Sequence, residues 1–153
     1  MHLVPTEICL DANIFIAALV KVEPLHQAAL ELWDKIDEES IDLFEPGLVF
    51  FEVISALHQK SQKEGMSHLE RDTAIDIFYH TNLIFQWQAS VLKTATDLAS
   101  RLDLKRIYDC SYLAVAMNRK IPFITSDERF LRAGKKIYRE IYSCREFLEN
   151  VSI

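Results

Sequence analysis

Three aspartates lie where short apolar segments of the chain give way to helices. Asp11 follows the apolar segment Thr6–Leu10, Asp127 follows Pro122–Thr125, and Asp109 opens a helical pattern. In open parallel sheets, ligands bind outside the carboxyl ends of the strands, so such positions favour a binding site. The alternative is helix capping, for which aspartate is also preferred and contributes ~1 kcal/mol.

Glu52 is the fourth acid that could do chemistry. It lies within the apolar run Leu48–Ile54, in what the pattern predicts to be the middle of a helix, with no cap to form. A charged group in apolar surroundings is costly unless it is paired or bound to a metal. The alternative is an exposed polar stripe that Glu52 shares with Ser55 and Gln59.

Other kinds of active site lack their residues in this chain. There is no GxSxG, Walker A, GxGxxG or HExxH motif, and the five histidines lie outside the segments that hold the acids. Aspartate and glutamate oxygens, with no histidine or cysteine at ligand spacing, suit hard cations such as Mg²⁺ or Mn²⁺.

The elements that position these acids form an alternating pattern. Strands are expected at Thr6–Leu10, Ile41–Glu45, Leu83–Phe85, Pro122–Thr125 and Ile137–Ile141. Helices are expected from Asn13, Pro24, Pro46, Ala89 and Asp109, from capping boxes at Ser67 and Ser143, and as one turn over 127–133. This alternation predicts an α/β fold with a mostly parallel central sheet and helices on both faces, in one domain over residues 1–153.

Composition fits a compact globular protein of the cytoplasm. Half of the 153 residues are apolar, and the longest apolar run, Ile14–Val20, is far shorter than the ~20 residues that span a membrane. Glu7 and Asp11 interrupt the apolar stretch that a secretory signal would need. Three widely spaced cysteines indicate reduced thiols.

Charge is distributed unevenly along the chain. Residues 101–139 carry ten basic and four acidic side chains, a net charge of +6, although the whole chain has −6. This segment fits a phosphate-binding surface beside an acidic site, but solvated basic helices would give the same asymmetry.

Four segments together resemble the acidic motifs of PIN-domain ribonucleases, in the family's order and at comparable spacing. They are Leu10–Phe15, Phe51–Val53, Tyr108–Ala116 and Ile124–Phe130. The length and layout are similar to those of VapC-like toxins of type II toxin–antitoxin pairs. The resemblance covers nearly the whole chain, and it implies a PIN-like three-layer fold.

The resemblance also implies a metal-dependent endoribonuclease. Its catalytic and metal-binding residues would be Asp11, Glu52, Asp109 and Asp127, with Mg²⁺ or Mn²⁺ as cofactor. Its substrate-binding residues would include Asn13, Thr125, Lys105, Arg106, Arg129 and Arg132, although local hydrogen bonding alone could explain Asn13 and Thr125. The substrate would be single-stranded RNA or an RNA loop, cut to leave 5′-phosphate and 3′-hydroxyl ends.

Partners follow from the same resemblance: a small antitoxin and a second copy of the chain in a homodimer. Some of six aromatic side chains could form an exposed apolar groove or a homodimer face, or all six could belong to the core: Phe50, Phe51, Phe78, Tyr79, Phe85 and Trp87.

Two other functions remain open at this point. One is a non-catalytic PIN-like interaction module. The other is a haloacid-dehalogenase-type phosphatase that uses Asp11, although Asn13 stands where that family expects a second aspartate.

Overall fold

The computed structural model describes residues 3–151, and within them five parallel strands form one sheet in the order β3-β2-β1-β4-β5. The strands are β1 (Glu7–Leu10), β2 (Asp42–Pro46), β3 (Leu83–Gln86), β4 (Phe123–Ile124) and β5 (Ile141–Tyr142). The predicted α/β fold with a largely parallel sheet is confirmed.

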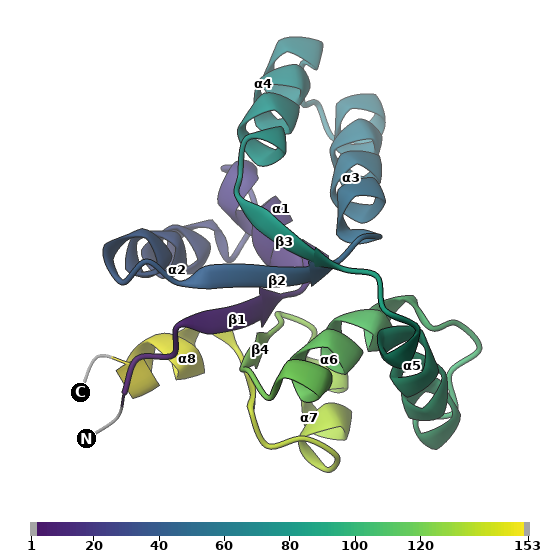
Figure 1. The fold of residues 1–153 in the computed structure, drawn as a ribbon. Coiled ribbons are helices and arrows are strands. Elements are labelled where there is room, and N and C mark those ends of the chain that lie inside the picture. Colours follow the sequence, from purple (N-terminus) through teal and green to yellow (C-terminus); the bar gives the residue numbers. More distant parts are fainter. Residues whose placement is uncertain (1–2, 152–153) are drawn as a thin grey trace.

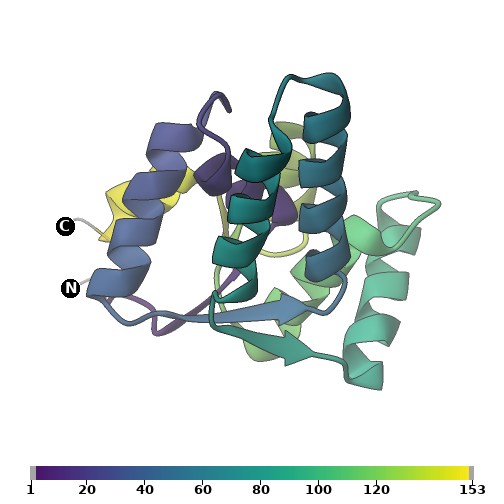
Figure 2. The ribbon, with the colours of Figure 1, turned by 90° about the horizontal axis from the view of Figure 1, so that it is seen from above.

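Helices cover both faces of this sheet. They are α1 (Ala12–Leu19), α2 (His26–Glu38), α3 (Val49–Lys63), α4 (His68–Tyr79), α5 (Ala89–Arg101), α6 (Tyr108–Arg119), α7 (Glu128–Lys135) and α8 (Cys144–Val151). Helices α1, α3 and α4 lie on one side of the sheet and α5 and α6 on the other (Figure 1). Seen from above, α3 and α4 form a hairpin of adjacent helices (Figure 2). In residues 3–151 no helix has the length and apolar character needed to cross a membrane.

Two elements differ most from those that the sequence predicts. Pro46 is the last residue of β2, not the first of a helix, and α3 begins only at Val49 after the turn at Gly47. The strand predicted for Ile137–Ile141 is wrong over most of its length, because β5 comprises only Ile141 and Tyr142. The chain before β5 instead folds back on the end of α7, whose Gly134 carbonyl accepts two backbone hydrogen bonds.

Both predicted capping boxes are confirmed. The Ser67 hydroxyl accepts from the Glu70 amide at 3.1 Å, and the Glu70 carboxylate accepts from the Ser67 amide at 2.7 Å. Ser143 and Glu146 form the same reciprocal pair at the start of α8. Each pair satisfies amides that the first turn of a helix would otherwise leave without partners.

The two central strands are buried on both faces. Ile8, Leu10, Phe123 and Ile124 have no exposed surface. Burying a side chain of this size contributes about 1.5–3 kcal/mol, so packing firmly fixes the carboxyl ends of β1 and β4.

Strand β1 is forked between its two neighbours. Its first half pairs with β2, through Glu7 and Ile8, and its second half pairs with β4, through Cys9 and Leu10. Where β2 leaves β1, the side chain of Glu45 replaces the missing backbone partner, and its Oε1 accepts from the Leu10 amide at 2.7 Å. The sheet is therefore open between β1 and β2 at the edge where ligands of such folds bind.

Candidate acidic active site

The order in which strands are added to the parallel sheet reverses between β1 and β4. Strands β1, β2 and β3 follow one another outward on one side, and β4 and β5 extend on the other. The crevice outside the carboxyl ends of strands at such a switch point is the usual ligand site of open α/β sheets. Asp11 directly follows β1, and Thr125 directly follows β4.

Asp11 stands at the N-cap position of α1 but does not cap it with its side chain. Its carboxylate is 8% exposed, and Oδ2 accepts hydrogen bonds from Thr125 Oγ1 at 2.8 Å and from Asn13 Nδ2 at 3.3 Å. Capping alone therefore does not explain this aspartate. Its carboxylate is held at the crevice by neighbouring side chains.

Thr125 and Asn13 link the two halves of the site. The Thr125 hydroxyl donates to Asp11 and accepts from the Asp127 amide at 3.1 Å, and Asn13 Oδ1 accepts from the Ser126 amide at 3.3 Å. Thr125 is fully buried, which places its hydroxyl behind Asp11 and away from solvent. It positions Asp11 relative to the loop that carries Asp127.

Asp127 and Asp109 belong to the starts of two other helices. Asp127 caps α7, since its Oδ1 accepts from the Phe130 amide at 3.0 Å, so the capping interpretation is confirmed for this residue. Asp109 lies in the first turn of α6 but not at its N-cap, which is Ile107. Among the hydrogen bonds and ion pairs of residues 3–151, none involves the Asp109 carboxylate.

Glu52 lies in the first turn of α3, not in the middle of a helix as the sequence predicts. The helix dipole favours a carboxylate there. The exposed-stripe alternative does not hold, because Ser55 and Gln59 are exposed but Glu52 is partly buried. Its Oε1 is inaccessible to solvent and has no hydrogen-bond partner within the described part of the chain.

The four carboxylates repel one another. Burial raises the pKa of Asp11 to about 6, an effect that the Thr125 hydrogen bond reduces and the charges of Asp109 and Asp127 increase. Burial likewise raises the pKa of Glu52 to about 7, and the charges of Asp11 and Asp109 add to the rise. Partial burial and the charge of Asp127 raise the pKa of Asp109. Asp11 and Asp109 thus lie within electrostatic range of each other and of both Glu52 and Asp127.

Within the part of the chain that the structure describes, no protein cation is paired with this charge. None of the six ion pairs formed within residues 3–151 includes any of the four acids. In the same residues, no three His, Cys, Asp or Glu side chains are yet close enough to hold a metal ion. The donor set nevertheless fits a hard divalent cation, because it consists of carboxylates and includes the orphaned Oε1 of Glu52. Such an ion would have to draw the carboxylates together.

Two polar residues beside the acids are not among the site residues that the sequence predicts. Glu45 has no exposed surface, and burial raises the pKa of its carboxyl well above the ordinary value of 4.5. Tyr112, in α6, is equally buried, and its hydroxyl has no hydrogen-bond partner among the described residues. The one signal for Glu45 is a carboxylate in the short apolar strand of residues 41–45, and Tyr112 resembles any apolar residue of its helix.

The basic candidates flank the acids without contacting them. Lys105 and Arg106 are exposed in the loop before α6, Arg129 and Arg132 are exposed on α7, and none of the four forms an ion pair in residues 3–151. Other basic residues of segment 101–139 have structural roles. Arg119 forms an ion pair with Glu7 at 3.1 Å and lies 3.6 Å from the centre of the Phe44 ring.

The six aromatic residues divide between core and surface. Phe78 is buried, Phe50 and Phe85 pack against the core, and Phe51, Tyr79 and Trp87 are exposed. The alternative that all six belong to the core is thus wrong, and three of them are exposed, as the other expectation requires.

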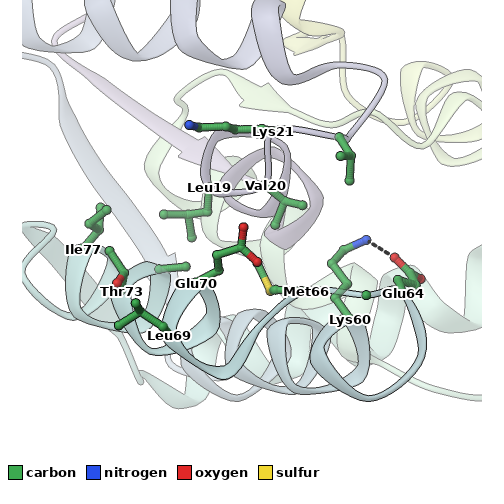
Figure 3. Close-up of a pocket in the computed structure, with 13 residues that line it drawn as sticks. Leu19, Val20, Lys21, Lys60, Glu64, Met66, Leu69, Glu70, Thr73 and Ile77 are labelled. Atoms are coloured by element: carbon green, nitrogen blue, oxygen red, sulfur yellow. Dashed lines mark hydrogen bonds and ion pairs between the residues drawn. The ribbon is translucent and has the colours of Figure 1, made fainter.

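A separate groove of ≈ 490 Å³ lies between the end of α1 and the α3–α4 hairpin. Leu19 and Val20 face Met66, Leu69 and Ile77 across it (Figure 3). None of the four acids lines this groove, so it is distinct from the acidic site.

The fold and the site together define an open parallel α/β protein with an acidic cluster at its switch point. The sequence profile of the PIN domain matches residues 8–136. The chain therefore belongs to the PIN domain family. This assignment rules out the alternative of a haloacid-dehalogenase-type phosphatase.

Solved structures of similar fold include VapC proteins of toxin–antitoxin pairs. VapC20 of Mycobacterium tuberculosis, a sarcin–ricin-loop-cleaving toxin, has a TM-score of 0.65 and 20% identity, over 83% of this chain and 95% of that one. VapBC2 of Rickettsia felis, bound to a promoter DNA fragment, has a TM-score of 0.61 and 18% identity, over 90% and 98%. VapBC-5 of M. tuberculosis has a TM-score of 0.53 and 16% identity, over 91% and 98%. A search of curated proteins gave no match.

Proposed function

We propose that this protein is a metal-dependent endoribonuclease and the toxin of a toxin–antitoxin pair. The observation that carries the proposal is the cluster of four mutually repelling carboxylates at the switch point, with no protein cation paired to any of them within residues 3–151. Such a cluster is stable at neutral pH when it binds a divalent cation.

Asp11 and Asp109 are proposed to hold the principal Mg²⁺ or Mn²⁺ ion, with Glu52 and Asp127 completing its surroundings directly or through water. When bound, such an ion lowers the pKa of water and polarises a phosphate oxygen. Thr125 and Asn13 hold the Asp11 carboxylate in place by their hydrogen bonds. Asp127 keeps one oxygen for this role, because its cap uses only Oδ1.

The proposed reaction is hydrolysis of an RNA phosphodiester. The oxygen of a water molecule bonds to phosphorus, the bond from phosphorus to the 3′ oxygen breaks, and that oxygen takes up a proton. The products carry a 5′-phosphate and a 3′-hydroxyl. Lys105, Arg106, Arg129 and Arg132 hold the phosphate backbone, since they are exposed and free of ion pairs in the described structure.

The proposed substrate is single-stranded RNA or an RNA loop. Support comes from VapC20, whose description names the sarcin–ricin loop as its target. Bases in loops are unstacked and accessible, which makes them the usual targets of RNA-specific proteins.

The proposed partners are a small antitoxin and a second copy of the chain. The apolar groove between α1 and the α3–α4 hairpin offers a surface for an antitoxin segment, and the exposed Phe51, Tyr79 and Trp87 offer apolar area for a dimer. The three buried cysteines are free thiols, as expected in the reducing cytoplasm to which we assign the protein.

Cleavage assays with matched variants test the catalytic proposal. Wild-type protein should cut a labelled stem–loop RNA with Mn²⁺ or Mg²⁺ but not in EDTA, and should not hydrolyse a phosphomonoester. Asp109→Asn should abolish cleavage, whereas Asp97→Asn, an exposed aspartate on α5, should leave it unchanged. Full cleavage in EDTA would overturn the metal mechanism. No cleavage under any condition would favour the non-catalytic interaction module.

Expression in a bacterial host tests the partners. Wild-type protein should arrest growth, co-expression of the adjacent small gene should relieve the arrest, and the two products should co-purify. Light scattering should give the mass of a dimer. Harmless expression of an active nuclease would overturn the toxin assignment, and a monomeric mass would overturn the dimer.

A further inference from the structure

The hydroxyl of Tyr112 is a buried donor that lacks an acceptor of ordinary hydrogen-bond geometry among the described residues. The side chain is fully buried in α6, and its hydroxyl forms no hydrogen bond within the described residues. Its ring stacks on Phe123 with centroids 6.4 Å apart. A phenylalanine would provide the same packing, and an unpaired buried hydroxyl costs stability, so core packing does not explain the oxygen.

The Tyr112 hydroxyl faces the acidic site. Burial raises the pKa of the phenol far above its ordinary value, and the negative charges of Glu52, Glu45 and Asp11, in that order, add to the rise. The group therefore keeps its proton and can only donate to these acids. In return, hydrogen bonding from the Tyr112 hydroxyl lowers the pKa of Glu52, so the two groups lie next to each other, although no hydrogen bond of ordinary geometry joins them within residues 3–151.

One carboxylate oxygen of Glu52 likewise lacks a hydrogen-bond partner among the described residues. Its Oε1 is buried and has no partner in residues 3–151. Its other oxygen, Oε2, is not among the buried unpaired atoms and forms no hydrogen bond in those residues, so water or an ion can reach it. One oxygen of Glu52 is thus buried without a partner in a side chain that interacts with the Tyr112 hydroxyl, and the other is accessible to solvent.

We propose that Tyr112 is the positioning residue for Glu52: its hydroxyl donates to Oε1 of the ionised carboxylate and so directs Oε2 to the divalent cation. This inference rests on the proposed function, because it assumes that Glu52 serves the ion. Groups that orient a metal ligand typically change metal affinity by about 10- to 100-fold when they are removed.

Glu45 limits the alternatives for the hydroxyl. Its Oε1 accepts from the Leu10 amide, and Cys9 Sγ lies 3.7 Å from its Oε2. Both oxygens of Glu45 therefore have partners. Glu52 Oε1 has none, which makes it the acceptor that needs the donor.

Two tyrosine-to-phenylalanine variants of the full chain test this inference. Tyr112→Phe removes the unpaired hydroxyl, and the control Tyr138→Phe removes one that donates to the Ile121 carbonyl at 2.7 Å. The readouts are the Mn²⁺ dissociation constant, from the electron paramagnetic resonance signal of free Mn²⁺, and Tm in EDTA. Tyr112→Phe should weaken Mn²⁺ binding by about 10- to 100-fold with an equal or higher Tm. Tyr138→Phe should lower Tm and leave Mn²⁺ binding unchanged.

A double-mutant cycle tests whether Tyr112 acts on metal binding through Glu52. In a Glu52→Gln background, Tyr112→Phe should have no further effect on Mn²⁺ binding, because the carboxylate it serves is absent. Wild-type affinity in Tyr112→Phe, or an equal loss in both backgrounds, would overturn the positioning role while the metal site stands. If wild-type protein itself binds no Mn²⁺, the proposed function fails and this inference fails with it.

Discussion

In the ion-free protein, folding holds Asp11 in surroundings that disfavour its charge, and Asp11→Asn should remove this penalty. Asparagine has nearly the same shape, and its amide oxygen can still accept from Thr125. The pKa of Asp11 rises from an ordinary value of 3.8 to about 6 in the folded chain. This difference corresponds to about 3 kcal/mol of lost stability when the group is ionised in both states. Because the side chain is only 8% exposed, solvent screens little of it.

The sign of the effect depends on pH. A carboxyl whose pKa is raised by folding binds its proton more tightly in the folded state, so its contribution is fully present below about pH 4 and is lost as pH rises through 6. Asparagine does not titrate. The variant should therefore exceed wild type in free energy of unfolding by about 3 kcal/mol at pH 8, and this advantage should nearly vanish by pH 4.

Urea unfolding in EDTA at several pH values between 4 and 8 measures this difference. Asp97→Asn, an exposed position on α5, serves as the control and should follow wild type throughout. An Asp11→Asn variant that is less stable than wild type at pH 8, or that differs from it equally at every pH, would refute the charge-crowding argument.

Three further predictions follow from the same site. Mn²⁺ at a hundred times its dissociation constant should raise the free energy of unfolding of wild type by ~2.7 kcal/mol, measured by urea titration, and a similar gain in Asp11→Asn would exclude Asp11 as a ligand. Glu45→Gln should keep the acceptor for the Leu10 amide and nearly full stability, whereas Glu45→Leu should lose about 1–3 kcal/mol; equal stability of the two in denaturation would contradict the role assigned to that hydrogen bond. The pair Arg129→Glu and Arg132→Glu should raise KM for RNA and weaken its salt dependence without changing the Mn²⁺ dissociation constant, and an unchanged KM would remove α7 from the substrate surface.

The sequence predicts which strands and helices carry the residues of the site better than it predicts the contacts between their side chains. Asp11 is correctly placed at the end of a strand, because the apolar run before it is short and the helical pattern after it is clear. Glu52 is assigned to the right helix but to the wrong part of it. Pro46 fits the last residue of a strand as well as the first turn of a helix, and only the pairing of β2 with β3, in which Pro46 lies opposite Gln86, decides between them.

The remaining features depend on contacts between distant segments. That Thr125 is buried behind Asp11 follows from the adjacency of β1 and β4, which are more than a hundred residues apart in the chain. The partners of Glu45 depend on where β2 leaves β1. Local patterns carry no information about such contacts, and the family resemblance supplies the acids but not the groups that orient them.

The fork in β1 makes the spacing of the site adjustable by substitution. In an unbroken sheet, two neighbouring strands keep a separation of ≈ 4.7–4.9 Å, set by backbone hydrogen bonds that no side chain can alter. Here a side chain, that of Glu45, spans the gap beside Leu10. Its length helps to set how far the tip of β1, which carries Asp11, stands from the turn that leads into α3 and Glu52. Related chains with a shorter or longer residue at this position could thus widen or narrow the same acidic site without any change of fold.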